Sequence, residues 1–424
     1  MRNFSVCRAL VILTAASSFA AAQSTAKAPR QPIAVTSGYF AALNAAPKHT
    51  ASNKLSEATN AATQAQDPRI VSVPNFTGSF SFGGSTYSYT MIGRQPRAKQ
   101  TTTVPTTYVP LSFYFDEFVD ANGNNITIDA TVDTDEIKNS PLFENAEYAT
   151  GNTQFVDAQM RAEFWPLFNK DGDNDGDDNF HVLLSKPQTL IPVTIEVPVG
   201  SSEVYVLQDG TYFALIDINF IVSQLNTLVQ TEPITVKAIP IFLTRNAVYG
   251  GFSADAPVSC CVGGFHTAFE ANQTATKIFV QTLVFATSLD PDVSNGIFGD
   301  PAVFSDVNAL SHEIAETMND PFANNIVPSY QIPGAAAGTC QNSLEVGDIV
   351  ENLAPDYTDV TLHGYTYHPQ TLGLLQWFEG KTPSDAVNGD YSFPDSTKLT
   401  GPFTACPAAS STTNAATSAA PTTP

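Results

Sequence analysis

Positive charge is scarce in this chain. Its 424 residues include 19 Lys and Arg against 41 Asp and Glu, which gives a formal net charge of −22. A surface of this sign repels phosphate groups, so nucleic acid and anionic membranes are disfavoured as partners. Beyond residue 22 no apolar run is long enough to cross a bilayer, so we expect no membrane insertion.

Two kinds of catalytic or metal motif are also missing. No Gly-x-Ser-x-Gly elbow is present, which argues against a Ser-His-Asp hydrolase. No spaced Cys-x-x-Cys pair is present, which argues against a cysteine-rich zinc site. The chemistry of this chain must therefore be sought in other residues.

The N-terminal segment has the pattern of a secretory signal peptide. Arg2 and Arg8 give it a positive start, residues 9–20 form a short apolar run, and small residues at 20–22 offer a cleavage site. Cys7 precedes the apolar run, which does not fit a lipid-anchored cysteine. We therefore predict a signal peptide over residues 1–22 and a secreted, extracellular protein.

Four cysteines follow the predicted signal peptide: Cys260, Cys261, Cys340 and Cys406. An even number in an exported chain predicts two disulfides, and four cysteines allow three connectivities. Because Cys260 and Cys261 are adjacent, we expect them to bond to different partners.

The composition divides the rest of the chain. Residues 23–68 are rich in Ala, Thr, Ser and Asn and predict a disordered linker or pro-segment, and residues 407–424 predict a disordered tail. Alternating β-branched and aromatic residues predict an antiparallel β-rich region over 69–234, with one helix near 154–165. Residues 235–406 mix strands with helices. The predicted fold class is α+β, an N-terminal antiparallel β-rich region followed by a zincin-like α+β region.

The most informative segment is Ser311-His-Glu-Ile-Ala-Glu-Thr-Met-Asn-Asp-Pro321. His312 and Glu316 are four residues apart, so on a helix they lie on one face and can reach one metal ion. Glu313 lies beside them, where a general base for an activated water would stand. The segment is similar to the His-Glu-x-x-His helix of zinc metallopeptidases, with Glu316 in place of the second histidine.

A helix beginning at Ser305 or Asp306 and running to about Met318 would carry these residues. An apolar stripe of this helix is expected to face the core, and the side that bears the ionisable residues is expected to line a cleft. An ordinary solvated polar face would use the same spacing. With only six histidines and 14% charged residues in the chain, however, so tight a cluster is unusual.

Further ligands are expected downstream. Glu345 is the first choice for a third metal ligand, with Asp348 orienting a ligand histidine, and Asp320 is an alternative ligand. His266 and His368 are candidates for binding substrate or stabilising an oxyanion. Zinc is the expected metal, although ligands this rich in oxygen also suit manganese, magnesium or calcium.

A second cation site is predicted in the acidic segment 171–178. It begins like a calcium loop, with Asp171, Asp173 and Asp175 as side-chain ligands, Gly176 at the turn and Asp177 offering its carbonyl. The expected Glu at the twelfth position is absent, so this is not a standard EF-hand. We expect a structural calcium site; a solvated hairpin tip is the alternative.

Three segments in the same order resemble secreted proteins of the plant phosphate-induced, exordium-like type and their bacterial relatives. They are residues 261–269, the helix at 312–321 and residues 345–348, within a similarity that covers roughly residues 235–380. Those proteins carry a Cys-Gly-x-His element, a Ser-His-Glu-x-x-Glu helix and then an acidic segment. The resemblance implies that one cleft contains His266, His312, Glu313, Glu316, Glu345 and Asp348.

These observations predict a secreted metal-dependent hydrolase, with a zinc metalloendopeptidase acting on protein or peptide as the leading hypothesis. His312, Glu316 and Glu345 would hold the metal, and Glu313 would deprotonate the attacking water. One alternative is a non-catalytic cell-wall or surface protein that holds a structural cation and binds a cell-wall polymer. A glycosidase that uses two carboxylates is the other alternative.

Overall fold

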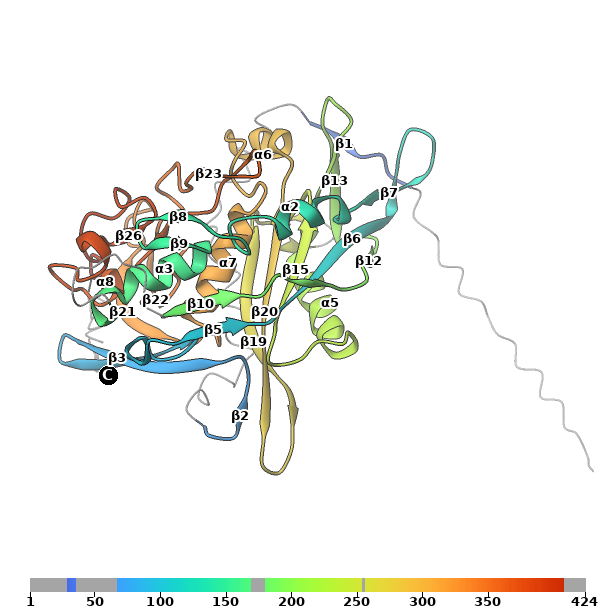
Figure 1. The fold of residues 1–424 in the computed structure, drawn as a ribbon. Helices are drawn as coiled ribbons and strands as arrows, with labels where there is room; N and C mark the ends of the chain where they lie inside the picture. Colours follow the sequence, from blue (N-terminus) through green and yellow to red (C-terminus); the bar gives the residue numbers. More distant parts are fainter. Residues whose placement is uncertain (1–28, 36–66, 169–179, 254–255, 408–424) are drawn as a thin grey trace, which may run out of the picture.

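The computed structural model describes residues 29–35, 67–168, 180–253 and 256–407 (Figure 1). The predicted signal peptide, most of the predicted linker and tail, and the predicted calcium loop at 171–178 lie outside these residues. The described part contains both helices and strands and is α+β, as predicted. Among its helices, none is long and apolar enough to cross a membrane.

A mixed eight-stranded sheet forms the centre of the molecule (Figure 1). Its main path runs β11-β6-β15-β20-β19, where β6 and β15 are parallel, β15 and β20 are parallel, and β19 and β20 form an antiparallel hairpin. The long strand β6 changes partners along its length, pairing first with β11 and β15 and then with β12 and β7. The strands are β2 (Ile70–Val71), β6 (Thr106–Val119), β7 (Asn125–Ile128), β11 (Gln188–Thr189), β12 (Val193–Val197), β15 (Ile239–Arg245), β19 (Gly264–Gln273) and β20 (Ile278–Ser288).

A smaller sheet has the order β1-β13-β14-β16, with β1 (Ile33–Ala34), β13 (Ser202–Val206), β14 (Tyr212–Asp217) and β16 (Ala247–Gly250). The helix α5 (Ile218–Thr231) follows β14, and Asp217 caps it by accepting the N–H of Asn219 at 2.7 Å. Buried side chains from α5, β6, β12 and β14 form one hydrophobic core. This core occupies the opposite side of the central sheet from the helix that carries the predicted motif.

The other face of the sheet is covered by helices and hairpins. The helix α7 (Asn308–Asn319) packs on β19 and β20, and it also contacts α3 (Phe155–Glu163) and β4 (Ser85–Ile92). Strand β4 pairs with β3 (Asn75–Phe82), and β5 (Thr101–Val104) pairs with β10 (His181–Leu184). The predicted helix near 154–165 is confirmed as α3. A large second core joins these elements.

The remaining elements are short and lie mainly around the helical side of the molecule. The helices are α2 (Thr134–Lys138), α4 (Trp165–Phe168), α6 (Pro291–Phe298), α8 (Leu375–Phe378), η3 (Pro96–Ala98), η4 (Thr131–Asp133) and η5 (Val387–Gly389). The strands are β8 (Ala146–Tyr148), β9 (Gly151–Thr153), β17 (Phe252–Ser253), β18 (Ala256–Pro257), β21 (Ile326–Gln331), β22 (Cys340–Ser343), β23 (Val360–Leu362), β24 (Tyr365–Tyr367), β25 (Leu372–Gly373) and β26 (Ser392–Phe393).

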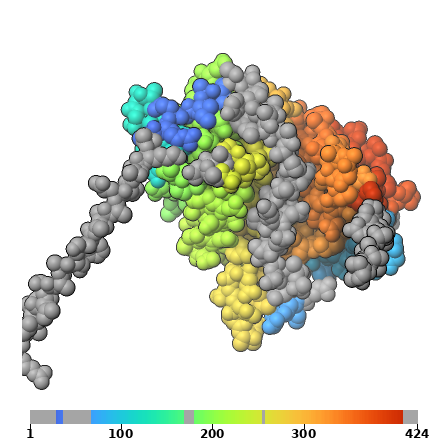
Figure 2. All heavy atoms as spheres, turned by 180° about the vertical axis from the view of Figure 1, so that it is seen from behind, coloured from blue at the N-terminus to red at the C-terminus, as the bar shows by residue number. Residues whose placement is uncertain are grey.

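The tip of the β19–β20 hairpin projects from the body of the molecule. Residues 270–277 are exposed, and the hairpin extends below the rest of the chain both in Figure 1 and from behind in Figure 2. The opposite end of the hairpin is buried and lies against α7. Only that buried end contributes to the site described below.

The strand directions differ in part from the sequence prediction. Pairs β3–β4 and β13–β14 are antiparallel, as expected for the N-terminal region, but β5–β10, β6–β11 and β6–β12 are parallel. Several strands and helices, α3 among them, lie between β5 and β10 in the chain, and a connection of this length allows two strands to pair in parallel. The central sheet also spans the boundary expected at residue 234, since β6 pairs with β15.

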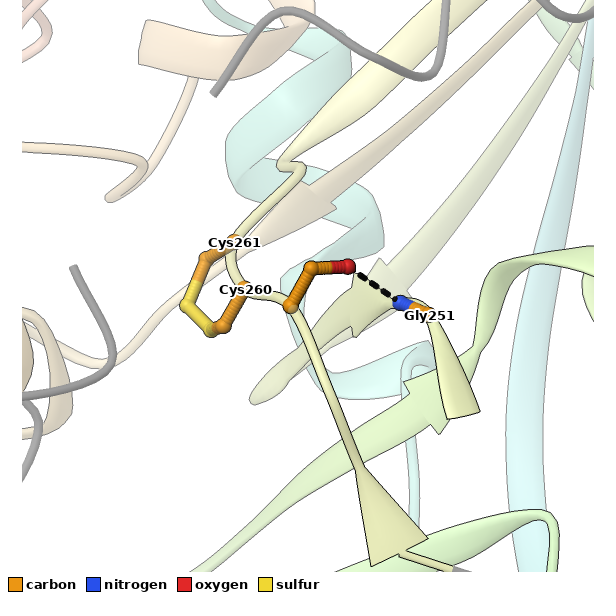
Figure 3. Close-up of a disulfide and its surroundings, with 4 residues drawn as sticks. Gly251, Cys260 and Cys261 are labelled. Carbon is orange, nitrogen blue, oxygen red and sulfur yellow. Dashed lines mark hydrogen bonds between the residues drawn. A yellow bond between two sulfur atoms is a disulfide. The ribbon is translucent and has the colours of Figure 1, made fainter. Parts of the chain in front are cut away.

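The disulfides correct a second expectation. Cys340 is bonded to Cys406, but Cys260 and Cys261 are bonded to each other rather than to different partners (Figure 3). Strand β21 pairs with β22 on one side and bridges Ala405 on the other, which places Cys340 and Cys406 with their Cα atoms 6.1 Å apart. Of the four cysteines after residue 22, Cys261 is then the one left to pair with Cys260.

Candidate metal centre

The helix α7 carries the predicted motif and is buried along its whole length. Val307, Leu310, Ile314 and Met318 belong to the hydrophobic core, which confirms the expected apolar stripe. The helix begins at Asn308, later than the predicted cap residues Ser305 and Asp306. The Asp306 carboxylate is not a helix cap because it accepts the N–H groups of Val307 and His368 instead.

The end of α7 explains the role of Asp320. Its carboxylate oxygens accept the N–H groups of Asn324 and Asn325, each at 2.9 Å, and Pro321 prevents a further helical turn. Burial raises the pKa of Asp320 to about 6, and these N–H groups lower it in part. Asp320 therefore shapes the turn after the helix, and it belongs to neither of the two potential metal groups found among the described residues.

Strand β19 brings His266 to the helix. Successive side chains of a strand point to opposite faces, so Phe265 enters the core beyond the sheet while His266 points toward α7. The glycine before them permits a close approach, because a Cβ on Gly264 would lie 2.8 Å from Cγ of Glu313. Gly264 thus lets the backbone of β19 lie close against α7 beside His266.

The loop after β22 supplies Glu345 and Asp348. Its backbone is tied to the surrounding chain by the N–H of Leu344 bonded to Asn325 and the N–H of Gly373 bonded to Val346. Gly347 lies directly against the imidazole of His312, since a Cβ there would be 2.6 Å from the ring. No larger residue fits at this position without moving the histidine.

These three elements enclose a pocket of about 60 Å³. Its lining contains two histidines and five acids and no Lys or Arg, and the acids include Glu351, which the sequence did not single out. Cys261 also lines it, so the vicinal disulfide lies at its wall. All six residues that the family resemblance implied are among the lining: His266, His312, Glu313, Glu316, Glu345 and Asp348.

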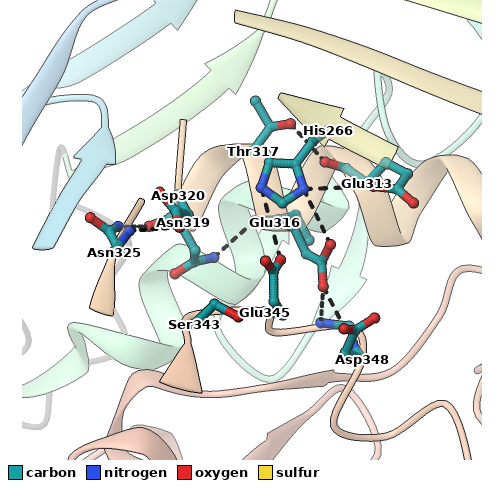
Figure 4. A network of polar contacts seen from close by, with 12 residues as sticks. His266, Glu313, Glu316, Thr317, Asn319, Asp320, Asn325, Ser343, Glu345 and Asp348 are labelled. Atoms are coloured by element: carbon teal, nitrogen blue, oxygen red, sulfur yellow. Dashed lines mark hydrogen bonds and ion pairs between the residues drawn. The ribbon is translucent and has the colours of Figure 1, made fainter. Parts of the chain in front are cut away.

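The side chains converge on Glu316 (Figure 4). Its Oε2 lies 3.1 Å from Nε2 of His312 and 3.3 Å from Nδ1 of His266. Its Oε1 accepts the N–H groups of Gly347 and Asp348 at 3.1 and 3.3 Å. One oxygen is therefore held by the backbone of the loop after β22, residues 344–348, which we call the acidic loop. The other oxygen faces both imidazoles.

The outer acids surround the same two histidines. Oε2 of Glu313 lies 3.7 Å from Nδ1 of His266, and Oε2 of Glu345 lies 3.9 Å from Nε2 of His266. Oδ1 of Asp348 lies 3.6 Å from Nε2 of His312. The groups His266–Glu313–Glu316 and His312–Glu316–Asp348 each bring three ligand atoms within 4.8 Å of one another and could hold a metal ion.

Burial and charge shift the pKa values in this pocket. Burial would lower the pKa of both histidines, but the neighbouring carboxylates outweigh it and raise both well above the usual range. Burial raises the pKa of Glu313 to about 7, and it also raises that of Glu345 well above the usual range. For Glu316, burial acts in the same direction, but His312 and His266 hold its pKa well below the usual range.

Several buried polar atoms make no hydrogen bond with any residue that the structure describes. They are Nε2 of His266, Oε2 of Glu313 and Oε2 of Glu345, all in side chains that are at least nine-tenths buried. A buried polar atom without a partner is costly, because it has lost its bonds to water. Imidazole and carboxylate are also the ligand types that zinc and manganese prefer. The donor set therefore fits a divalent cation.

The positions of Glu345 and Asp348 differ from those expected. Asp348 faces the same nitrogen of His312 as Glu316 does, so it lies on the ligand side rather than behind the histidine. Glu345 faces Nε2 of His266, away from Glu316. Sequence spacing could place both acids near the helix but could not decide which nitrogen each would face.

His368 lies outside the pocket lining. Its Nδ1 is 2.6 Å from Oδ2 of Asp306, and its ring packs edge-on against Tyr357. The hydrogen bond that Nδ1–H of His368 donates to Asp306 raises the pKa of His368, and partial burial opposes the shift. The structure therefore separates His368 from the other candidates and gives it no contact from which to stabilise an oxyanion in the pocket.

Two glutamines hold the site from behind, and sequence reasoning missed both. Oε1 of Gln370 lies 3.0 Å from Nδ1 of His312, and its Nε2 donates to the carbonyl of Gly347 at 2.9 Å. Nε2 of Gln341 donates to Oδ2 of Asp348 at 3.1 Å. No local pattern marks a glutamine that orients a ligand, so only the contacts reveal these residues.

Comparisons of the chain with models of protein families, with curated proteins and with solved structures found no match.

Proposed function

We propose that this pocket is the active site of a secreted metal-dependent hydrolase, with a zinc metalloendopeptidase as its leading form. One observation carries the proposal: two histidines and several carboxylates converge on Glu316 in a buried pocket whose lining contains no Lys or Arg. The disulfide between Cys340 and Cys406 fits the oxidising compartment of a secreted protein.

The cation would be held by His312, Glu316 and Asp348, whose ligand atoms lie within 4.8 Å of one another. This set replaces the expected third ligand Glu345 with Asp348. A divalent cation bound there would polarise a substrate carbonyl and lower the pKa of a water molecule. Its single imidazole and two carboxylates favour zinc or manganese over metals such as calcium, which prefer oxygen ligands alone.

Glu313 is the side chain best placed to accept a proton from water. Burial raises its pKa to about 7, which is close to the value that suits a general base at neutral pH. Its Oε2 has no hydrogen-bond partner, and Nδ1 of His266 lies 3.7 Å away, where the imidazole can position the carboxylate. The same acid can later pass the proton to a leaving amine.

The pocket also limits the substrate. A volume of about 60 Å³ admits the reacting group but not a large side chain, so a peptide would have to lie across the pocket. The acidic lining repels anionic groups. We therefore expect protein or peptide substrates that are neutral or basic next to the cleaved bond.

The test compares Glu313→Gln with the wild type and with Glu144→Gln, whose carboxylate pairs with Lys186 and His363 away from the pocket. Metal content is measured by elemental mass spectrometry and turnover with a peptide library. We expect Glu313→Gln to keep the catalytic cation at His312–Glu316–Asp348 but lose about 100-fold or more in kcat, and Glu144→Gln to match the wild type. Full turnover in Glu313→Gln would disprove the assignment of the base.

A second candidate function is a non-catalytic cell-wall or surface protein. The observation in its favour is that the same residues come from α7, β19 and the acidic loop, so a cation would join three elements and act structurally. If removing the metal unfolds the protein and no hydrolysis is found, this candidate replaces the first, and binding to cell-wall polysaccharide is the next assay. A glycosidase would instead keep its activity in the presence of a chelator.

A further inference from the structure

Glu316 has the geometry of a bridging ligand. Its Oε1 is fixed by two backbone N–H groups of the acidic loop, and its Oε2 lies within 3.3 Å of a nitrogen from each of two histidines. A carboxylate that only capped a helix or paired with one histidine would not need both of these arrangements. Glu316 is only 3% exposed, so water does not supply the partners of its carboxylate oxygens.

The two histidines belong to different ligand groups. His266 is grouped with Glu313 and Glu316, whereas His312 is grouped with Glu316 and Asp348. Glu316 is the residue common to both groups. The ligand atoms therefore surround two neighbouring positions rather than one.

His312 is also supported on the side that faces away from Glu316. Because Nε2 of Gln370 donates to Gly347, its Oε1 must accept from Nδ1–H of His312, which leaves the lone pair of a neutral His312 on Nε2, toward Glu316. A hydrogen bond of this kind orients a histidine for metal binding. Nε2 of His266 makes no hydrogen bond, and Oε2 of Glu345 lies 3.9 Å from it.

Charge balance points the same way. The pocket is lined by the acids Glu313, Glu316, Glu345, Asp348 and Glu351, and its lining contains no fixed cation. The four acids that lie within 4 Å of the two histidines, Glu313, Glu316, Glu345 and Asp348, carry four negative charges when ionised, which two divalent ions balance and one does not. Uncompensated charge in a buried site is costly.

We infer that the pocket binds two divalent cations, one at His312–Glu316–Asp348 and one at His266–Glu313–Glu316, with the Glu316 carboxylate shared between them. This inference rests on the proposed function, in which the same pocket holds the catalytic cation. Two-metal sites have ions about 3.5–4 Å apart and assist hydrolysis by stabilising both the attacking and the leaving group.

The experiment is a zinc titration of metal-free, full-length protein by equilibrium dialysis, with the zinc content measured by elemental mass spectrometry. Excess calcium is present throughout to saturate oxygen-only sites such as the predicted loop at 171–178. We expect two zinc ions per chain in the wild type and one in each of His266→Ala and His312→Ala. Glu316→Gln should weaken the binding of both ions by about 100-fold or more.

The matched control is His363→Ala, because this histidine is exposed and pairs with Glu144 on the surface. It should still bind two ions. Glu313→Gln should keep the ion at His312 and lose the one at His266. Near-ultraviolet circular dichroism of each metal-free variant identifies any variant that has failed to fold.

A second readout does not depend on variants. Manganese(II) loaded into the wild type should show spin coupling between paired ions in its electron paramagnetic resonance spectrum. Uncoupled manganese, or one zinc ion per chain that both histidine variants lose, would overturn the two-cation inference while leaving the proposed function intact. A wild-type chain that binds no zinc would overturn both.

Discussion

Two clusters of buried acids in this protein differ in how their negative charge is balanced. In the first, which we call the Arg30 cluster, Arg30 bonds both oxygens of Glu203 at 2.7 and 2.9 Å and lies 3.5 Å from Glu117. The second oxygen of Glu117 accepts the N–H of Gly200 at 3.0 Å. The second cluster is the pocket around Glu316. Among the residues that the structure describes, no Lys or Arg lines this pocket, and one oxygen each of Glu313 and Glu345 makes no hydrogen bond.

The difference shows what each cluster is for. Arg30 also exchanges backbone hydrogen bonds with Glu117 and Val119, so its cluster attaches the N-terminal segment to the end of β6. That arrangement is complete within the chain. The pocket is complete only when something else supplies positive charge, whether protons or a cation, and this is the property expected of a binding site.

The largest expected effect is that zinc stabilises the fold through the pocket and not through the Arg30 cluster. Zinc at about a thousand times its dissociation constant should raise the free energy of unfolding by about 4 kcal/mol, because only the folded chain assembles the ligands. The measurement is urea unfolding with zinc and with a chelator. Glu316→Gln should lose most of this difference, whereas Glu203→Gln should retain it. A wild-type protein equally stable in zinc and chelator would contradict the comparison.

A smaller effect is expected from removing the fixed cation. Arg30→Met leaves Glu117 and Glu203 buried without their partner, and it should lower the free energy of unfolding by ~2 kcal/mol, less than for a fully buried pair because the Arg30 side chain is 31% exposed. Urea unfolding in chelator measures this. The control is Arg69→Met, whose pair with Asp67 is exposed and should contribute nothing measurable.

The smallest effect should have opposite signs in the two clusters. Because burial raises the pKa of Glu345, the metal-free folded chain at neutral pH must either protonate this acid or bury its charge. Glu345→Gln removes that cost, and it should stabilise the fold by about 1 kcal/mol. Glu203→Gln breaks a bidentate pair and should destabilise the fold by about 1 kcal/mol or more. The two variants are compared by thermal unfolding with chelator. Destabilisation by both would mean that the pocket acids stabilise the fold without a metal.

The local patterns of the sequence predicted some elements well. The apolar stripe of α7 and the spacing of its ionisable residues depend on helical periodicity alone, so both could be read before any tertiary contact was known. The same holds for α3. The cysteine number likewise predicted two disulfides without any knowledge of the fold, although not which cysteines pair.

Other features depend on which distant segments meet. The direction of β10 against β5 depends on how the long connection between them folds, and the alternation of residues carries no such information. The pairing of Cys340 with Cys406 follows from β21 lying between their segments. The link from Gln370 to His312 spans 58 residues, and no local motif announces it.

The sequence by itself determined that a helix would present His312, Glu313 and Glu316 together, because positions four apart on a helix share a face. Only the tertiary structure decided what surrounds them. Strand β19 adds His266, Gly347 lets the acidic loop lie against His312, and Glu316 is placed between the two histidines. The reason is physical: ligand geometry depends on distances of a few ångströms between side chains from separate elements, and packing alone sets those distances.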